Sequence, residues 1–408
     1  MTGIVLSASV RQNLLSLQST AELLSTTQNR LATGNKVNSA LDNPTNYFTA
    51  QSLNNRASDI TNLLDGIGNG VQVLQAANTG ITSLQKLVDT AKSIANQVLQ
   101  TTVGYSTKAN VDVTGTGAGT GTVTAANINS GKLAGSVITF KTSTGTLAVT
   151  IGATFTTGSG TATVSSLDQL NSVLASNNIG VNASVSATAD TLTFTSTNDA
   201  ASQTITKTGT APTGPGVDIS GTTAATVGTV NAAVADPASQ AIRANLVSQY
   251  NGIVAQITTT AQDSSFNGIN LLNGDTLKLT FNETGKSTLN ISGVTYNATG
   301  LGLNTLVSGT DFLDNSSANS VITALSAAST SLRTEASALG SNLSIVQIRQ
   351  DFSKNLINVL QTGSSNLTLA DTNQEAANSQ ALSTRQSIAV SALALANLSQ
   401  QSVLQLLR

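Results

Sequence analysis

The feature that most constrains the fold of this chain is a long apolar repeat over residues 318–360. Apolar, small or uncharged side chains recur there at alternating steps of four and three residues, which is a heptad repeat. Its positions are Ala318, Ile322, Leu325, Ser329, Leu332, Ala336, Leu339, Leu343, Val346, Gln350, Ser353, Ile357 and Leu360. At about 1.5 Å per residue, the repeat makes a helix roughly 65 Å long, far beyond the usual globular length. We therefore predict a helix in the core of a rod or fibre, ending at Gly363-Ser364-Ser365-Asn366.

Two further heptad seams lie in the first hundred residues. The first consists of Val10, Leu14, Leu17, Ala21, Leu24, Gln28 and Leu31. The second runs from Ile60 to Ile81 and resumes at Leu84 after a three-residue slip. Taken alone, the first seam also fits an amphipathic helix of an ordinary bundle. Between the two seams, residues 34–46 are rich in turn formers, and Asp42, Asn43 and Pro44 predict a linker.

The C-terminal residues 376–408 read as a helix that is apolar on more than one side. They contain no Pro or Gly, and Ala, Leu and Gln dominate from residue 387 onward. One line consists of Ala389, Ala392, Ala396 and Val403, and another of Leu393, Leu404 and Leu407. A helix of this kind requires burial on several sides, which other copies of the chain would supply. We therefore predict that these residues, with Val10, Leu14, Leu17, Leu24 and Leu31, form a polymerisation core.

Composition narrows the possible functions. The chain has no His and no Cys, so it lacks an imidazole base, a thiol nucleophile and soft metal ligands. We expect no catalytic site, no cofactor and no bound metal. A formal net charge of −2 argues against nucleic-acid binding. Only 9% of residues are charged, against about a quarter in an average protein, which suggests a surface that packs against copies of itself.

The sequence also shows no pattern typical of a secretory signal or of a membrane-spanning helix. The first residues have no basic segment followed by a long apolar one, so we do not expect a standard secretory signal. No run approaches 18 apolar residues, so we expect no membrane insertion.

The middle of the chain changes character near Gly104. From there to Val230 it is rich in Thr, Ser, Gly and Val, and alternating segments around residues 137–151 and 181–195 predict β-hairpins. Asp236-Pro237 predicts a helix start, because Asp caps the helix and Pro fits its first turn. Beyond that helix, Phe266-Asn267-Gly268 and Asn273-Gly274 predict tight turns with positive φ, and residues 277–291 predict another hairpin.

Several of these segments resemble bacterial flagellins. At the C-terminal end the match is Ala394-Leu395-Ala396-Asn397, followed by Gln401-Ser402-Val403-Leu404-Gln405-Leu406-Leu407-Arg408. Near the other end it is Asn29-Arg30-Leu31-Ala32-Thr33-Gly34, and in the middle it is the turn box Phe266, Asn267 and Gly268 with the following Leu271-Leu272-Asn273-Gly274. The resemblance implies a secreted, extracellular structural protein that is no enzyme. Identical subunits would form a helical flagellar filament for swimming, after type III export in an unfolded state. It also implies a flagellar export chaperone, a cap protein and hook-junction proteins as partners.

The expected fold class is α+β. A long antiparallel coiled-coil core is made by both chain ends, with a β-hairpin and an inserted mostly-β outer domain. The expected segments are an N-terminal inner-core helix (residues 1–33), an N-terminal linker with coiled-coil helices (34–103), the inserted outer variable domain (104–235), a helix with the turn box and hairpin (236–314), a long C-terminal coiled-coil helix (315–363), and a C-terminal linker with an inner-core helix (364–408).

Two departures from the usual flagellin pattern stand out. Asn43-Pro44 replaces the family's usual residues after Asp42, and the large insertion precedes the turn box instead of following it. One alternative is the related junction protein between hook and filament. Another is a secreted adhesin or enzyme on a helical stalk, which requires a chemical constellation in residues 105–230. We find no carboxylate pair or phosphate loop there, and the Gly-rich run around residues 114–119 lacks the Lys of a P-loop.

Overall fold

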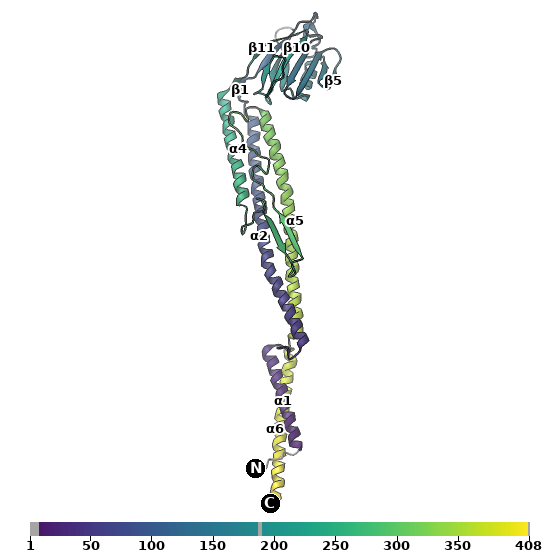
Figure 1. The fold of residues 1–408 in the computed structure, drawn as a ribbon, viewed down its shortest axis with the longest axis vertical. Helices are drawn as coiled ribbons and strands as arrows, with labels where there is room; N and C mark the ends of the chain where they lie inside the picture. The colour runs from purple at the N-terminus through teal and green to yellow at the C-terminus, as the bar shows by residue number, and fades with distance from the viewer. Residues whose placement is uncertain (1–7, 187–189, 407–408) are drawn as a thin grey trace. The chain divides into compact units, whose positions relative to one another are not determined.

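The computed structural model describes residues 8–186 and 190–406, and Figure 1 shows the order of its elements. The helices are α1 (Ala8–Thr33), α2 (Pro44–Gln100), α3 (Leu167–Ser176), α4 (Pro237–Asp263), α5 (Asn315–Thr368) and α6 (Thr372–Leu406). The strands are β1 (Tyr105–Thr107), β2 (Asn110–Gly115), β3 (Val137–Thr142), β4 (Gly145–Ile151), β5 (Thr156–Gly158), β6 (Thr161–Val164), β7 (Val181–Val185), β8 (Thr191–Ser196), β9 (Thr204–Thr206), β10 (Gly216–Thr223), β11 (Ala225–Asn231), β12 (Val234–Ala235), β13 (Thr276–Thr280) and β14 (Thr288–Ser292). A short 3-10 turn, η1, spans Gly131–Leu133. The chain forms two compact units.

The first unit comprises residues 1–72, 278–291 and 342–408. Within it, the first half of α2 packs on the last half of α5 through the cluster Ala57, Ile60, Ile357 and Leu360. The two-stranded hairpin β13–β14 lies against α2, because a Cβ at Gly70 would collide with the Leu279 side chain. The glycine inside the helix therefore makes room for the hairpin.

The second unit comprises residues 73–277 and 292–341. Its helical part is built from the rest of α2, from α4 and from the first half of α5. Apolar side chains at heptad positions of these helices are almost fully buried. This packing stabilises the helices although interior glycines lower their helix propensity. Tyr250 of α4 packs edge-on against Phe312, with ring centroids 6.1 Å apart.

A buried arginine joins three helices of this second unit. Arg243 of α4 is 0% exposed and directs its guanidinium at the C-terminal end of α2. Its Nε donates to Thr102 O at 2.7 Å, and Nη2 donates to Thr101 O at 3.0 Å and Val98 O at 3.1 Å. The last carbonyls of a helix lack intrahelical partners and carry partial negative charge, so a cation there is favourable. Burial lowers the pKa of Arg243, and the charge of Asp314 partly offsets this effect.

The same arginine also reaches the segment that leads into α5. Nη1 donates to Phe312 O at 2.6 Å, and Nη2 donates to Asn315 Oδ1 at 3.1 Å. Arg243 thus satisfies acceptors at the end of α2 and at the start of α5.

The inserted domain lies between α2 and α4 and contains two sheets. One has the strand order β5-β6-β4-β3-β10-β9 and the other β11-β2-β8-β7. Their inner faces and α3 share one core that includes Phe140 and Phe194, which pack edge-on at 5.3 Å. The predicted hairpins are confirmed, since β3 pairs with β4 and β7 with β8, both antiparallel. Entry and exit strands β1 and β12 also pair, which closes the domain at its base.

Two helix ends differ from the sequence-based expectation. Helix α5 does not end at Gly363 but continues to Thr368, because Ser364 is buried against α2 and its Oγ donates to Ala50 O at 3.1 Å. Helix α2 already begins at Pro44, where Asn43 Oδ1 accepts a hydrogen bond from Asn46 N at 3.0 Å. Pro fits the first helical turn because its missing N–H needs no partner there. The linker is therefore shorter than residues 34–46.

The predicted fold class is confirmed. Long helices come from both ends of the sequence, a hairpin accompanies them, and a mostly-β domain is inserted between α2 and α4. The Asp236 cap of α4 is confirmed too, since its side chain accepts a hydrogen bond from Ala238 N.

Two glycines of α2 offer a matched test of this packing. A Cβ at Gly80 would collide with Ser264 Oγ and Leu272 Cδ1, whereas a Cβ at Gly66 would meet nothing within 4 Å. Alanine improves helix propensity at both positions by about 1 kcal/mol. We expect Gly66→Ala to raise the denaturation midpoint, and Gly80→Ala to lower it because overpacking costs about 1–3 kcal/mol. Urea titrations followed by circular dichroism would measure both. A higher midpoint for Gly80→Ala would contradict the close packing of residues 264–272 on α2.

Burial of Tyr250 predicts a loss of stability in alkali. Desolvation raises the pKa of Tyr250 from 10.0 to about 12. Between these values the unfolded chain loses the phenolic proton while the folded chain keeps it, so stability falls as pH rises from 10 toward 12. We expect Tyr250→Phe to make the unfolding midpoint less pH-dependent in this window, as measured by urea titrations at pH 9 and pH 11. Tyr47→Phe is the control, and equal pH dependence in both variants would refute the assignment.

Candidate functional site

The candidate site is the pair of terminal helices, α1 and α6, which run antiparallel beside each other (Figure 1). Both lack Pro, Gly and aromatic residues, so each forms an uninterrupted helix of small and medium-sized side chains. Charges are sparse, and α6 carries only Glu375 and Arg385. Most of the surface of this pair is therefore apolar or uncharged.

On α1, the buried face contains fewer aliphatic residues than expected. Val10 is 2% exposed, Leu17 and Leu24 are half-buried, and the remaining buried positions are Thr20 and Thr27. Thr20 satisfies its hydroxyl within the helix by donating to Ser16 O at 2.8 Å. Leu14 and Leu31, which belong to the predicted seam, are instead exposed. The face of α1 that packs on α6 is thus rotated from the predicted heptad face, and several leucines lie outside the contact.

On α6, half-buried side chains recur at steps of four and three, which marks the face toward α1. They are Leu382, Gln386, Ala389, Leu393 and Ala396. The two predicted apolar lines therefore merge, because Leu393 lies on the same face as Ala389 and Ala396. Ala392 is exposed. Val403 and Leu404 belong to α6, but their side chains, and all of Leu407, lie outside the described residues.

The pair leaves a large apolar surface without a partner in a single chain. Among described side chains, α1 exposes Leu15 at 65% and Leu23 at 52%, and α6 exposes Ile388 at 64%, Val390 at 51%, Leu395 at 70% and Leu398 at 62%. Burying one such side chain is worth about 1.5–3 kcal/mol. Ile388, Leu395 and Leu398 are seven and three residues apart, so they form one exposed apolar line along α6, and such a line marks a protein interaction site. The terminal helices are therefore suited to binding further helices.

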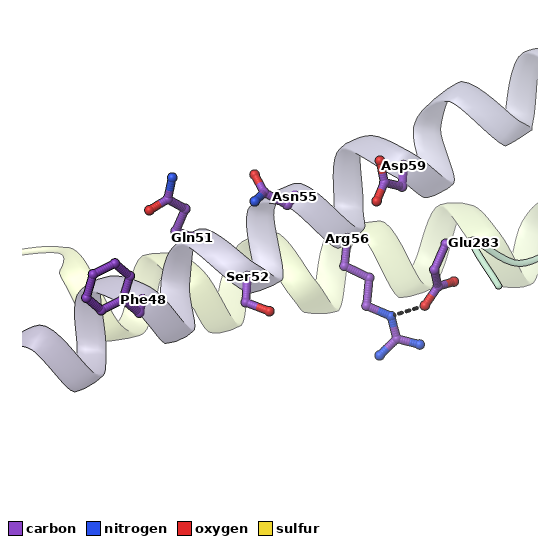
Figure 2. A pocket seen from close by; sticks show the side chains of 7 residues that line it. All are labelled: Phe48, Gln51, Ser52, Asn55, Arg56, Asp59 and Glu283. Atoms are coloured by element: carbon purple, nitrogen blue, oxygen red, sulfur yellow. Dashed lines mark ion pairs between the residues drawn. The ribbon is translucent and has the colours of Figure 1, made fainter.

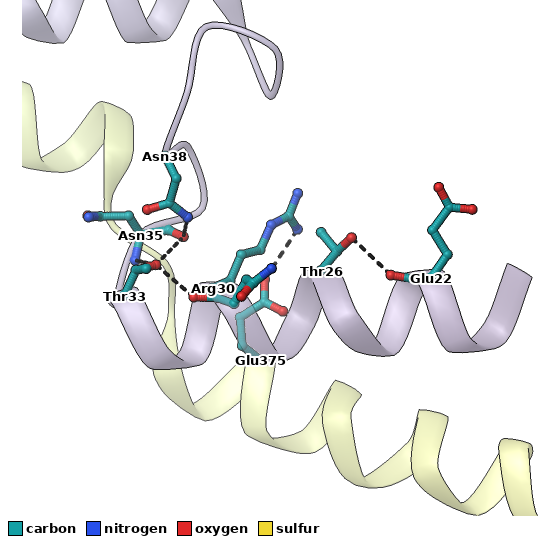
Figure 3. A network of polar contacts seen from close by, with 8 residues as sticks. Glu22, Thr26, Arg30, Thr33, Asn35, Asn38 and Glu375 are labelled. Atoms are coloured by element: carbon teal, nitrogen blue, oxygen red, sulfur yellow. Dashed lines mark hydrogen bonds and ion pairs between the residues drawn. The ribbon is translucent and has the colours of Figure 1, made fainter.

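A short joint connects this helix pair to α2 and α5 (Figure 3). The two connecting segments form an antiparallel bridge between Asn35 and Leu369. Lys36 N donates to Thr368 O at 2.7 Å, and Ala370 N donates to Gly34 O at 2.9 Å. Gly34 adopts φ +70°, a conformation that favours glycine. Backbone pairing thus holds both connections of the joint together.

An ion pair lies beside the joint. Arg30 Nη1 of α1 lies 3.5 Å from Glu375 Oε1 of α6, and Glu375 is 9% exposed (Figure 3). This contact pairs the last turn of α1 with the first turn of α6. Sequence reasoning missed this pair, although Glu375, the single acidic residue of the sparsely charged helix α6, was the available signal.

The predicted linker residues occupy distinct roles in the joint. Asp42 Oδ2 accepts hydrogen bonds from Asn38 N at 2.9 Å and Ser39 N at 2.8 Å, and these bonds lower the pKa of Asp42. Asn43 caps α2, and Pro44 is its first residue. All three therefore set where the linker ends and α2 begins.

The predicted turn box belongs to the second unit, and the terminal helices belong to the first. Asn267 and Gly268 have φ values of 49° and 80°, and Phe266 and Ile269 exchange two backbone hydrogen bonds of 3.0 Å around them. This turn orients the chain so that Leu271 and Leu272 are buried at 2% and 1%. Phe266 itself is 37% exposed, so it is less buried than the two leucines.

Hollows and acidic clusters among the described residues were the remaining places for a catalytic or metal site. A hollow beside α2 is lined by Phe48 and by polar side chains, among which Arg56 and Glu283 pair across it, with Nε 2.7 Å from Oε1 (Figure 2). Within residues 8–186 and 190–406, no group of three acidic side chains is placed to hold a metal ion. None of the helices in that part of the chain is long and apolar enough to cross a membrane.

Comparison with known proteins identifies the helical regions. The chain matches the bacterial flagellin N-terminal helical region over residues 6–112 and the bacterial flagellin C-terminal helical region over residues 322–407. These segments contain α1, α2, most of α5 and α6.

Two proteins called flagellins are similar in sequence to this chain. The chain is 32% identical to flagellin FljM of Caulobacter vibrioides over 165 residues, covering 40% of this chain and 59% of that protein. It is 30% identical to a flagellin of Brucella melitensis over 182 residues, covering 42% of this chain and 64% of the relative. The chain thus spans less than two thirds of the length of these relatives. The chain thus carries both the N-terminal and the C-terminal helical region of bacterial flagellins, with the expected fold around them.

Proposed function

We propose that this chain is the structural subunit of a bacterial flagellar filament, the helical propeller used for swimming. The observation that carries this proposal is the exposed apolar surface on α1 and α6, which includes Leu15, Leu23, Leu395 and Leu398. A single chain leaves these side chains in water, whereas repeated head-to-tail packing would bury them. Head-to-tail contacts whose rotation does not close produce an open helical polymer.

Each segment of the chain has its own place in the proposed filament subunit. Residues 1–33 and 364–408 form the inner core, with Val10, Leu17, Leu24, Ala389, Leu393 and Ala396 inside each subunit's helix pair. The exposed Leu14, Leu31 and Ala392 are available to neighbouring copies. Val403, Leu404 and Leu407 are proposed members of the same core, although their side chains lie outside the described residues. Residues 34–103 and 315–363 supply the surrounding coiled coil, and residues 236–314 brace it. Residues 104–235 form the outer variable domain. The protein acts structurally and not as an enzyme.

Export and partners follow from the family resemblance. The subunit would leave the cell unfolded by type III export, which suits a chain with no Cys and therefore no disulfides. An export chaperone, a cap protein and hook-junction proteins are its proposed partners, besides identical subunits. Its proposed location is the extracellular filament.

Seeded polymerisation tests the proposal. We expect the purified chain to elongate short filament fragments into long uniform filaments visible by electron microscopy. A variant lacking residues 393–408 should keep the circular dichroism of α2, α4 and α5 but form no filaments, because part of α6 is gone. Soluble monomers after seeding of the full chain would instead favour the helical-stalk alternative. Filaments made by the truncated variant would refute the role of α6.

A further inference from the structure

The asparagines that directly precede a glycine in this chain lie in different surroundings. Asn69 and Asn251 lie inside α2 and α4, whereas Asn267 and Asn273 lie in the segment between α4 and β13. An asparagine before a glycine loses its side-chain amide most readily, because glycine has no side chain to hinder attack by its own backbone nitrogen. Since the pairs share this local chemistry, the fold decides which of them reacts.

The two pairs inside helices are protected by their hydrogen bonds. Asn251 Nδ2 donates to Leu306 O at 2.8 Å, and Asn251 Oδ1 accepts from Leu306 N at 2.8 Å, so this amide is held at both ends. Asn69 is exposed but lies in the interior of α2, where the helical backbone directs the N–H of the next residue toward the preceding turn. Attack by the backbone nitrogen of Gly70 or Gly252 therefore requires the helix to open locally.

The pair Asn273-Gly274 lies in an exposed turn, but its backbone is restrained. Asn273 is bridged to Thr295, and Asn273 N donates to Asn270 O at 3.1 Å. A Cβ at Gly274 would lie 3.2 Å from Thr295 Oγ1, so this turn packs against the segment that follows β14. Rotation of Asn273 toward the attacking nitrogen would break these contacts.

The pair Asn267-Gly268 lacks these restraints. Both residues are exposed, and among the described residues neither the Asn267 amide nor the Gly268 N–H has a hydrogen-bond partner. Asn267 adopts φ 49°, a left-handed conformation that is unfavourable for a residue with a Cβ. Its intrinsic preference therefore favours rotation out of the turn, which brings the side chain toward the free backbone nitrogen.

We infer that the fold directs non-enzymatic deamidation to Asn267, with water as the co-reactant. The Gly268 nitrogen attacks Asn267 Cγ, a new C–N bond forms, the Cγ–Nδ2 bond breaks, and ammonia leaves with the proton of the Gly268 N–H. Water then opens the resulting five-membered imide. Hydrolysis of the bond to Cγ gives aspartate, and hydrolysis of the bond to the main-chain carbonyl carbon gives isoaspartate. The reaction does not depend on the proposed assembly.

Either product disturbs a turn that holds its neighbours in place. Phe266 and Ile269 exchange two hydrogen bonds of 3.0 Å across the pair, and isoaspartate inserts one more backbone atom between them. The next residue, Asn270, donates to Ala261 O and Gln262 O at 2.8 Å and so satisfies two of the last carbonyls of α4. The new carboxylate also follows the end of α4, where the partial charge of a helix is negative. Deamidation should therefore destabilise this region.

Peptide mapping of aged protein by mass spectrometry tests the inference. The purified full chain is incubated at mildly alkaline pH, once folded and once unfolded in guanidinium chloride, and the amide loss of each Asn-Gly pair is followed. In the folded chain, Asn267 should react at least about tenfold faster than Asn69 and Asn251, because these two require local helix opening. Asn273 should also react more slowly than Asn267. In the unfolded chain the rates should agree within about threefold, because the restraints of the fold are gone.

Asn267→Gly is the matched control, because glycine fits the positive φ of this turn and has no amide to lose. After ageing, the unmodified chain should unfold at a lower urea concentration than before, whereas Asn267→Gly should keep its midpoint. An equal fall in both proteins would overturn the structural consequence assigned to Asn267. Reaction of Asn69 as fast as Asn267 in the folded chain, or the same preference for Asn267 in guanidinium chloride, would overturn the inference itself, because the fold would then not select the site.

Discussion

Replacing Arg243 by alanine is expected to lower the free energy of unfolding of the helical core by about 3–5 kcal/mol. The guanidinium satisfies carbonyls at the end of α2 and the start of α5, and each buried acceptor left without a partner costs about 1–3 kcal/mol. The arginine is 0% exposed, so water cannot replace these bonds without opening the structure. Urea titration followed by helical circular dichroism would measure the loss.

Two further variants separate the effect of the Arg243 hydrogen bonds from the effect of its positive charge. Arg243→Lys keeps a cation but has three donors on one nitrogen and cannot reach acceptors on both sides of the guanidinium. We expect it to recover less than half of the lost stability. Arg333→Ala removes an exposed arginine from α5 and should change stability by less than about 0.5 kcal/mol. An Arg243→Ala protein as stable as the Arg333→Ala protein would show that the network contributes little.

The loss should also be localised. Because Arg243 holds the last turn of α2 through Val98 and Thr101, amide hydrogens near residues 98–102 should exchange faster in Arg243→Ala. The inserted domain has its own core around Phe140 and Phe194, so its amides should keep their protection. Hydrogen exchange measured by mass spectrometry would distinguish these two regions.

Arg243 also illustrates what the sequence could have revealed. It precedes Leu246, Val247 and Tyr250 at helical spacing, so it lies on the buried face of α4. A single cation on an apolar face of a sparsely charged chain is a recognisable signal. Its partners could not be predicted, because they are backbone carbonyls that only the tertiary fold brings within reach.

The long helices were predictable because their period is local. The seam over residues 318–360 repeats every 3.5 residues on average, and this spacing alone specifies a helix with a buried line. Leu325, Leu332 and Val346 are indeed fully buried. The end of that helix was not predictable, because local propensity disfavours Gly363 while the contact of Ser364 with α2 keeps the helix intact.

The buried face of α1 was predicted incorrectly for a different reason. Its leucines fall on adjacent lines, so the sequence cannot decide which line faces α6. In the structure Thr20 and Thr27 occupy the contact, while Leu15 and Leu23 face outward. The surplus of leucines has a physical meaning only if another helix covers them.

That surplus leads to the second large effect, a loss of assembly without a loss of folding. Leu395 and Leu398 are 70% and 62% exposed in the single chain, so replacing both by serine should leave its unfolding midpoint unchanged. If neighbouring copies bury both, their removal costs about 1.5–3 kcal/mol each, or roughly a hundredfold to ten-thousandfold in critical concentration. Sedimentation of seeded samples over a concentration series would measure it.

Leu393 supplies the matched contrast, since it lies only two residues from Leu395 but faces α1 and is half-buried. Leu393→Ser should lower the helical content of the monomer and weaken assembly together. Ala394→Ser, at an exposed position between them, should alter neither quantity by a comparable amount. Assembly of Leu395→Ser/Leu398→Ser at the unmodified critical concentration would mean that this side of α6 stays in water in the polymer. In that case the contacts between subunits would have to be formed by other surfaces of the chain.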